Sequence, residues 1–133
     1  MTHSQQTIVD LTLQLLRPLQ PVRGGYYASG LRPLNSTSED LVVGFLSGNA
    51  DQVQEGYIVI NIYTPMLYGT DGVRYHNHDR CLALEQQLTA LPDLLNPTAP
   101  VRYTLFGMAR TITEPTLQQS VVTAQYRFKH LTT

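Results

Sequence analysis

The stretch LVVGFLSGNADQVQEGYIVINIYTP, residues 41–65, decides the fold. Its first run, residues 41–46, is short and apolar, which is typical of a strand covered on both faces, although a buried helix can have the same pattern. The second run, residues 57–63, alternates strictly, and its three isoleucines share one face. Because successive side chains of a strand point to opposite faces, this run predicts a strand with one apolar side.

The segments on either side of the second run indicate how the chain turns. Residues 47–51 (SGNAD) are rich in turn-forming side chains, so the two runs are predicted to form an antiparallel hairpin. Pro65 should end the second strand, since proline cannot donate to a ladder. Residues 66–78 follow, with two glycines and no sustained periodicity. Loops of this length are often functional, so we expect this loop to make contacts.

Two helices are predicted from apolar residues at three- and four-residue spacing. The first covers residues 5–19, with Ser4 as its N-cap and Pro18 as its stop signal. The second covers residues 79–95, with Asn77 as its cap and Pro92 as a kink or end. The apolar stripe of the second helix consists of Cys81, Leu84, Leu88, Leu91 and Leu95.

The remaining segments complete an α+β arrangement. Residues 26–33 predict a short strand or extended edge, and residues 35–40 a polar loop. Residues 101–106 and 120–128 predict two closing strands, with a turn around residues 113–116. We therefore expect one domain, residues 1–133, with a mostly antiparallel sheet of four to five strands and two helices packed on it, in the order α-β-β-β-α-β-β.

The composition of the chain argues against several classes of function. The chain has 133 residues, a formal charge of −1 and only 14% charged residues, which disfavours nucleic-acid binding by phosphate neutralisation. No signal-peptide pattern and no long apolar run occur, so we expect cytosolic synthesis and no membrane span. Cys81 is the single cysteine, which excludes an intramolecular disulfide. The weakly charged composition is compatible with protein–protein contact.

The sequence offers one cluster of candidate metal ligands, His76-Asn77-His78-Asp79. A complete site would need further ligands, such as His3, His130, Cys81 or an acidic residue. The favoured interpretation is a polar loop that enters a helix, with Asn77 as the cap. Cys81 lies three residues after His78, which would suit a thiolate and its base, but its place in the apolar stripe favours a buried structural role. We predict no catalytic, cofactor or metal site.

Tyrosine is abundant in the extended and loop segments. Six of the eight tyrosines fall there, and they suit either a protein interface or the edge of the core, so both interpretations stay open: Tyr26, Tyr27, Tyr57, Tyr63, Tyr68 and Tyr75.

The order of these elements resembles the small tail-completion proteins of long-tailed bacteriophages, which are the tail terminators and related head–tail joining proteins. The resemblance rests on the helix at residues 8–19, the hairpin ending at residues 61–65, the helix at residues 79–95, and the strands at residues 101–106 and 120–128. It implies a non-enzymatic structural protein of the virion tail or neck, made in the host bacterial cytoplasm. It also implies a homo-oligomeric ring, commonly a hexamer, that caps the tail tube protein and joins neck or connector proteins, without cofactor, membrane or sequence-specific nucleic acid.

Under this resemblance the loop at residues 66–78 is the leading candidate for contact with a neighbouring subunit or the tube. Its candidate interface residues are Tyr68, Asp71, Arg74, Tyr75, His76 and His78. A component of a secretion system or contractile injection system would have the same physical requirements. The alternative from another class is a small metal-binding or metal-dependent hydrolase domain that uses His76, His78 and Asp79.

Overall fold

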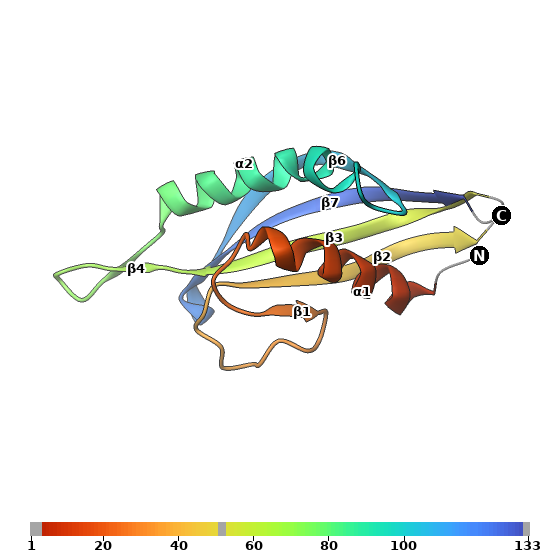
Figure 1. Ribbon diagram of the computed structural model, residues 1–133. Coiled ribbons are helices and arrows are strands. Elements are labelled where there is room, and N and C mark those ends of the chain that lie inside the picture. Colours follow the sequence, from red (N-terminus) through yellow and green to blue (C-terminus); the bar gives the residue numbers. More distant parts are fainter. Residues whose placement is uncertain (1–3, 51–52, 132–133) are drawn as a thin grey trace.

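The hairpin predicted from residues 41–65 forms the centre of the sheet (Figure 1). The computed structural model describes residues 4–50 and 53–131. Strand β2 (Asp40–Ala50) pairs antiparallel with β3 (Val53–Pro65), and β3 ends at the predicted proline. The turn is shorter than expected: residues 47–50 pair with residues 54–57 and continue β2. The last residue of the predicted turn, Asp51, lies outside the described residues.

Three further strands complete a mixed five-stranded sheet. Strand β7 (Gln119–Leu131) pairs antiparallel with β3, and β6 (Arg102–Glu114) pairs antiparallel with β7. Strand β1 (Tyr26–Ala28) pairs parallel with β2, which gives the order β1-β2-β3-β7-β6. The α+β class is confirmed. The predicted edge strand at residues 26–33 is shorter than expected, because the backbone turns away after Ala28 and Leu31 donates its N–H back to the Ala28 carbonyl.

The predicted long loop contains structure of its own. Strands β4 (Leu67–Tyr68) and β5 (Arg74–Tyr75) form a separate two-stranded sheet that extends beyond the main sheet (Figure 1). The expectation of a loop without regular structure was therefore wrong. Two residue pairs are too few to produce a recognisable alternation in sequence.

Helix α1 (Gln5–Leu16) begins as predicted. The hydroxyl of Ser4 accepts the N–H of Thr7 at 3.2 Å, which is the geometry of an N-cap. The helix ends three residues earlier than expected, and a 3₁₀ turn, η1 (Arg17–Leu19), carries the chain onward. Pro18 explains the change, because proline has no N–H for the α-helical ladder.

Helix α2 (His78–Leu95) is capped by Asn77, whose side-chain oxygen accepts the N–H of Arg80 at 3.3 Å. Pro92 does not end the helix. It removes the hydrogen bond that would reach the carbonyl of Leu88 four residues earlier. That carbonyl instead accepts a hydrogen bond from the buried hydroxyl of Tyr126 in β7. A neighbouring strand thus satisfies the group that the proline leaves without a partner.

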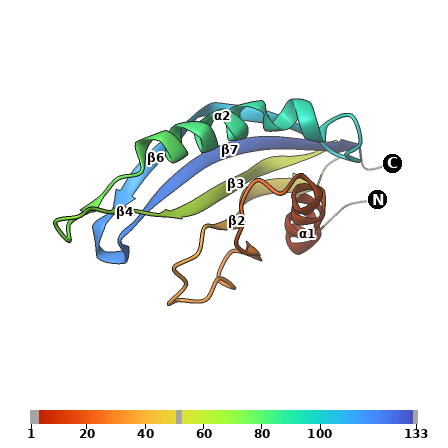
Figure 2. The same cartoon turned by 60° about the vertical axis from the view of Figure 1, so that its left-hand side comes forward.

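Both helices pack against the same face of the sheet (Figures 1 and 2). Their apolar stripes meet the predicted isoleucine face of β3 and the apolar face of β7, and the predicted stripe of α2 is buried in full. The β7 residues of this core are those predicted from alternation: Val122, Ala124, Tyr126 and Phe128.

Among the residues that the structure describes, neither α-helix packs on the opposite face of the sheet (Figure 2). No helix among the described residues is long and apolar enough to cross a membrane.

Strand β6 is longer than the prediction for residues 101–106. It continues to Glu114 and is followed by the 3₁₀ turn η2 (Pro115–Leu117) in place of a turn around residues 113–116. An irregularity allows this. Phe106 pairs with Gln125 and Arg110 with Thr123, so β6 advances four residues while β7 advances two. Gly107, with φ of +78°, absorbs the extra residues as a bulge.

Candidate functional site

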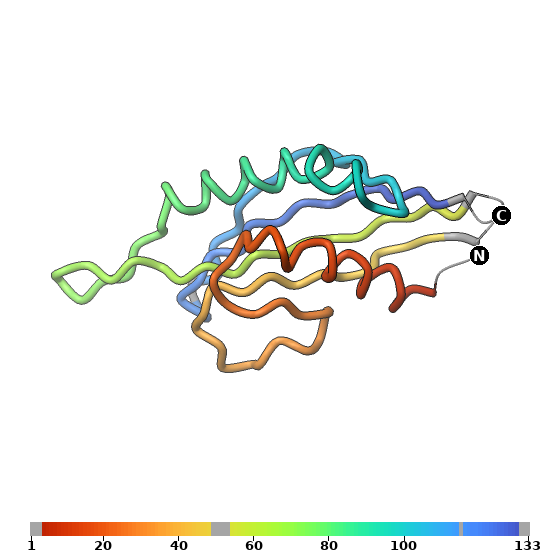
Figure 3. The backbone as a smooth tube through the Cα atoms, in the orientation of Figure 1, coloured from red at the N-terminus to blue at the C-terminus, as the bar shows by residue number. Residues whose placement is uncertain are grey.

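A projecting hairpin, residues 67–75, is the first candidate contact surface, and we call it the arm. It leaves the end of β3 and returns to the start of α2. Leu67 pairs with Tyr75, and Tyr68 with Arg74. The arm and the first turn of α1 lie at opposite ends of the sheet (Figure 3).

Contacts within the arm hold its tip in one conformation. The Asp71 carboxylate accepts the hydroxyl of Tyr75 at 2.6 Å and the N–H of Val73 at 3.0 Å. The Arg74 guanidinium lies 4.8 Å from the ring centroid of Tyr68. The hydrogen bond from Tyr75, followed by that from Val73, holds the pKa of Asp71 below its ordinary value. The tip therefore carries a carboxylate at neutral pH.

The arm exposes large side chains to solvent. Tyr68 is 68% exposed, and about half of Leu67, Val73 and Tyr75 is exposed as well. Tyr and Arg side chains in an apolar setting are typical of protein interfaces. Four of the six candidate interface residues lie on this arm: Tyr68, Asp71, Arg74 and Tyr75.

The other two candidate interface residues, His76 and His78, lie at the base of the arm. The His76 Nδ1 is 2.8 Å from the Ser120 hydroxyl oxygen, and the two histidine rings are 6.2 Å apart. Ser120 is only 1% exposed, so this serine–histidine pair cannot present a nucleophile to a substrate. The pair ties the arm to β7. Sequence reasoning missed it because 44 residues separate the partners.

The donor set around His76, His78 and Asp79 gives a metal site no support. Within residues 4–50 and 53–131, no group of three or more His, Cys, Asp or Glu side chains is arranged to hold a metal ion. His3, a possible further ligand, lies outside the described residues. Cys81 is buried in the core, and burial raises the pKa of its thiol, which fits the structural role predicted for it.

An ion pair anchors the base of the arm. Arg80 in α2 donates from Nε to the Glu39 carboxylate at 3.0 Å and from Nη2 to the Pro21 carbonyl at 3.2 Å. The same carboxylate accepts the hydroxyl of Thr64, at the end of β3, at 2.9 Å. A hollow of about 470 Å³ opens beside these groups. The cluster joins the segments from which the arm departs and returns, so it fixes the direction of the arm.

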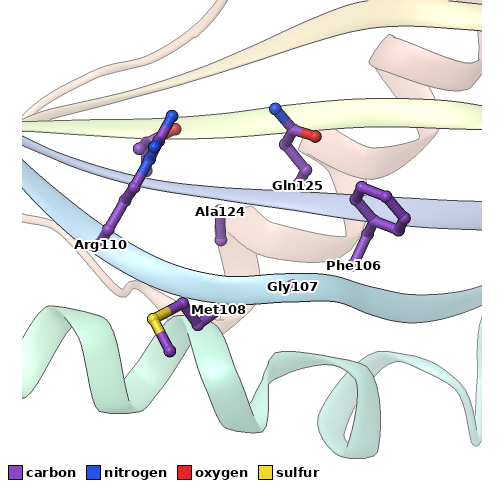
Figure 4. Close-up of a pocket in the computed structure, with 7 residues that line it drawn as sticks. Phe106, Gly107, Met108, Arg110, Ala124 and Gln125 are labelled. Atoms are coloured by element: carbon purple, nitrogen blue, oxygen red, sulfur yellow. The ribbon is translucent and has the colours of Figure 1, made fainter.

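The helix-free side of β3, β7 and β6 is the second candidate surface, and we call it the open face. Phe106 is 55% exposed, Ile112 is 43% exposed, and the ring of Tyr57 packs edge-on against Phe106 at 5.2 Å between centroids. Figure 4 shows Phe106, Arg110 and Gln125 extending over the strands, and Met108 extending beyond the outer edge of β6. Apolar side chains with interspersed polar groups make this face suitable for docking.

Arg110 lies on the open face in the edge strand β6, directly after the bulge. It lines a hollow of about 250 Å³ beside Phe106 and a second of about 510 Å³ beside Ile112. Its side chain has neither a hydrogen-bond acceptor nor an acidic partner within the part of the chain that the structure describes. An exposed guanidinium without a partner is available to an incoming carboxylate. No local pattern in the sequence singles out Arg110, because its position depends on the bulge in β6.

The loop at residues 29–37 covers the end of the open face nearest η2. Arg32 donates from Nε to the Asp40 carboxylate at 2.9 Å, and Ser36 donates its hydroxyl to the same carboxylate at 2.5 Å. The guanidinium of Arg32 also lies 4.1 Å from the ring centroid of Tyr63. Leu34, at the loop tip, is fully exposed. The predicted polar loop at residues 35–40 is therefore an anchored structure, whose polar residues do more than form turns.

Comparisons with known proteins do not assign a role to the arm or to the open face. No protein-family model matches the chain, and no curated protein matches it.

Proposed function

We propose that this protein is a non-enzymatic structural component of a phage virion, which forms a homo-oligomeric ring at the end of the tail tube and joins it to the neck or capsid connector. The observation that carries the proposal is the arm: an ordered hairpin that projects from the body with its large side chains in solvent. Such a surface is useful to a protein that must hold neighbours, and it offers no chemistry of its own.

The fold supports this proposal. The main elements follow the order helix, three strands, helix, two strands, as the resemblance to tail-completion proteins implies, and the arm is inserted before the second helix. A ring with rotational symmetry needs two different patches on each subunit, one for each neighbour. The arm and the open face are two such patches. The buried positions of Cys81 and Ser120 support a role without catalysis.

Assembly tests the proposal directly. Light scattering and negative-stain microscopy of the purified chain, alone and mixed with tail tube protein, are expected to show rings that increase with concentration. Immunogold labelling of purified particles is expected to place the protein between tail and head. A chain that remains a monomer alone and with tube protein, and that labelling does not detect in particles, would contradict the proposal.

A further inference from the structure

The arm and the open face match each other chemically. The arm exposes aromatic and aliphatic side chains beside the Asp71 carboxylate, and the guanidinium of Arg74 lies over the Tyr68 ring on the same arm. The open face exposes Phe106 and Ile112 beside the guanidinium of Arg110, and Glu114 lines the same hollow as Arg110 and Ile112. Opposite charges within apolar surroundings define the register of a docked pair. The formal charge of −1 means that self-repulsion opposes association of copies only weakly.

The arm projects away from the body of its own chain (Figure 1). It extends past the end of the sheet in both orientations of the ribbon and lies far from the opposite end, where α1 begins (Figures 1 and 2). The hydrogen bonds at its tip and the Glu39–Arg80 ion pair at its base oppose folding back. The arm is therefore placed to contact another molecule.

We propose that the arm of one copy docks on the open face of the next copy, with Asp71 of the arm beside Arg110 of the neighbour and the exposed arm side chains against Phe106 and Ile112. This contact rests on the proposed function, because it is the contact that would link subunits around the ring. It is heterologous: each copy gives its arm to one neighbour and its open face to the other, which permits a closed ring.

The arm docks on the face of the sheet and does not add a strand to its edge. Strand β6 is the long edge strand, but the bulge between Phe106 and Arg110 interrupts its ladder groups. Bulges of this kind prevent edge-to-edge pairing. The hydroxyl of Thr111 in β6 is also bound to Glu85 of α2.

Charge reversal tests the contact on the full-length chain. Asp71→Arg and Arg110→Asp each place like charges opposite one another, and each is expected to weaken self-association about tenfold. An equimolar mixture of the two variants is expected to associate like the wild type. In an alternating assembly every arm then meets a neighbour of opposite charge. Association is measured by analytical ultracentrifugation over a range of concentrations.

Two controls separate a lost contact from a damaged fold. Asp93→Arg reverses an exposed charge on α2, away from both surfaces, and is expected to leave association unchanged. Residue 110 is exposed, so Arg110→Asp is expected to leave the urea midpoint of unfolding unchanged. Asp71→Arg removes the hydrogen bonds that Asp71 accepts from Tyr75 and Val73 at the exposed arm tip, and it is expected to lower this midpoint only slightly. Restoration by mixing is itself evidence of intact folds, since unfolded chains would not complement each other.

The outcomes distinguish this contact from the proposed function. If the wild type forms rings and both variants assemble equally well, the contact is wrong while the ring stands. If both variants lose assembly and mixing fails to restore it, the arm and the open face meet different partners, such as the tube protein, and the contact is again wrong. A wild-type chain that never associates would overturn the contact and the ring together.

Discussion

At the scale of single residues, Glu39 and Asp40 are neighbours in sequence but tie different parts of the molecule together. Glu39 binds Arg80 of α2 and Thr64 of β3, and so fixes the base of the arm. Asp40 binds Arg32 and holds the loop at residues 29–37 on the sheet. Successive side chains of an extended segment point in opposite directions, which lets two adjacent carboxylates serve two separate anchors.

The Asp40 anchor gives the first prediction. Asp40 is 1% exposed and the Arg32 side chain 12% exposed, so removing the carboxylate charge leaves a guanidinium that water compensates poorly. We expect Asp40→Asn to lower the free energy of unfolding at pH 7 by about 2–4 kcal/mol, measured by urea denaturation. Asp93→Asn, at an exposed position of α2, is the matched control and should change it by less than about 0.5 kcal/mol.

The pKa of Asp40 determines how the difference in free energy of unfolding between the wild type and Asp40→Asn changes with pH. Burial alone would raise this pKa, but hydrogen bonds from Ser36, the Gly25 N–H and Arg32 outweigh it, and the pKa lies below 3.8. A carboxyl whose pKa is lowered in the folded state adds stability above its unfolded pKa and loses it as the pH falls through the folded pKa. The difference between wild type and Asp40→Asn should therefore shrink below about pH 4. A difference that stays constant in acid would contradict this assignment.

At the scale of elements, the final turn of α2 depends on β7. Pro92 leaves the Leu88 carbonyl without its helical partner, and the Tyr126 hydroxyl replaces that partner. Burial raises the pKa of Tyr126, so the phenol stays protonated and remains a donor through the neutral range. The sequence places both residues correctly in their elements, but the partnership depends on how the helix lies across the sheet.

A double-mutant cycle tests this partnership. Tyr126→Phe should lower the free energy of unfolding by about 1–3 kcal/mol, because it leaves a buried carbonyl unsatisfied. In the background of Pro92→Ala, where a backbone N–H is available to Leu88, the same change should cost clearly less. Urea denaturation of the four proteins measures the coupling. Equal costs in both backgrounds would mean that the Tyr126 hydrogen bond does not compensate for the proline.

At the scale of the whole molecule, the proposed contact joins the arm of one copy to the open face of the next. Charged residues make up 14% of the chain, and one ion pair is proposed between copies. The large exposed side chains proposed for this contact, such as Tyr68, Phe106 and Ile112, are apolar or aromatic. Exposed ion pairs contribute about 0–1 kcal/mol and weaken in salt, whereas apolar contacts do not.

A contact made of one ion pair and several apolar side chains predicts how the association of copies responds to salt. Raising NaCl from about 0.1 M to about 1 M should weaken the association of copies by at most about fivefold, measured by sedimentation. The Asp71→Arg and Arg110→Asp variants should respond in the opposite direction, because salt screens their new repulsion. Complete dissociation of the wild type at moderate salt would show that charge, and not the apolar surface, holds the copies together.

The sequence predicted the features that depend on interactions between residues close together in the chain, and it missed those that depend on distant residues. The helices, their caps at Ser4 and Asn77, and the apolar faces of β3 and β7 followed from local patterns and were confirmed. Local patterns did not predict the arm, the length of β6 or the full extent of β2. Short strands and strand extensions are formed by partners distant in the chain, which leave no periodicity of their own.

The sequence by itself determined the α+β class and the buried stripe of α2, since these depend on periodicity, proline and turn chemistry. It also marked the segment between Pro65 and α2 as the one proposed for contacts. Only the tertiary structure decided that this segment is an ordered arm, that Arg110 lies on an open face, and that His76 meets Ser120. The physical reason is that a side chain finds its partner through the packing of helix on sheet, and residues tens of positions apart share no local signal.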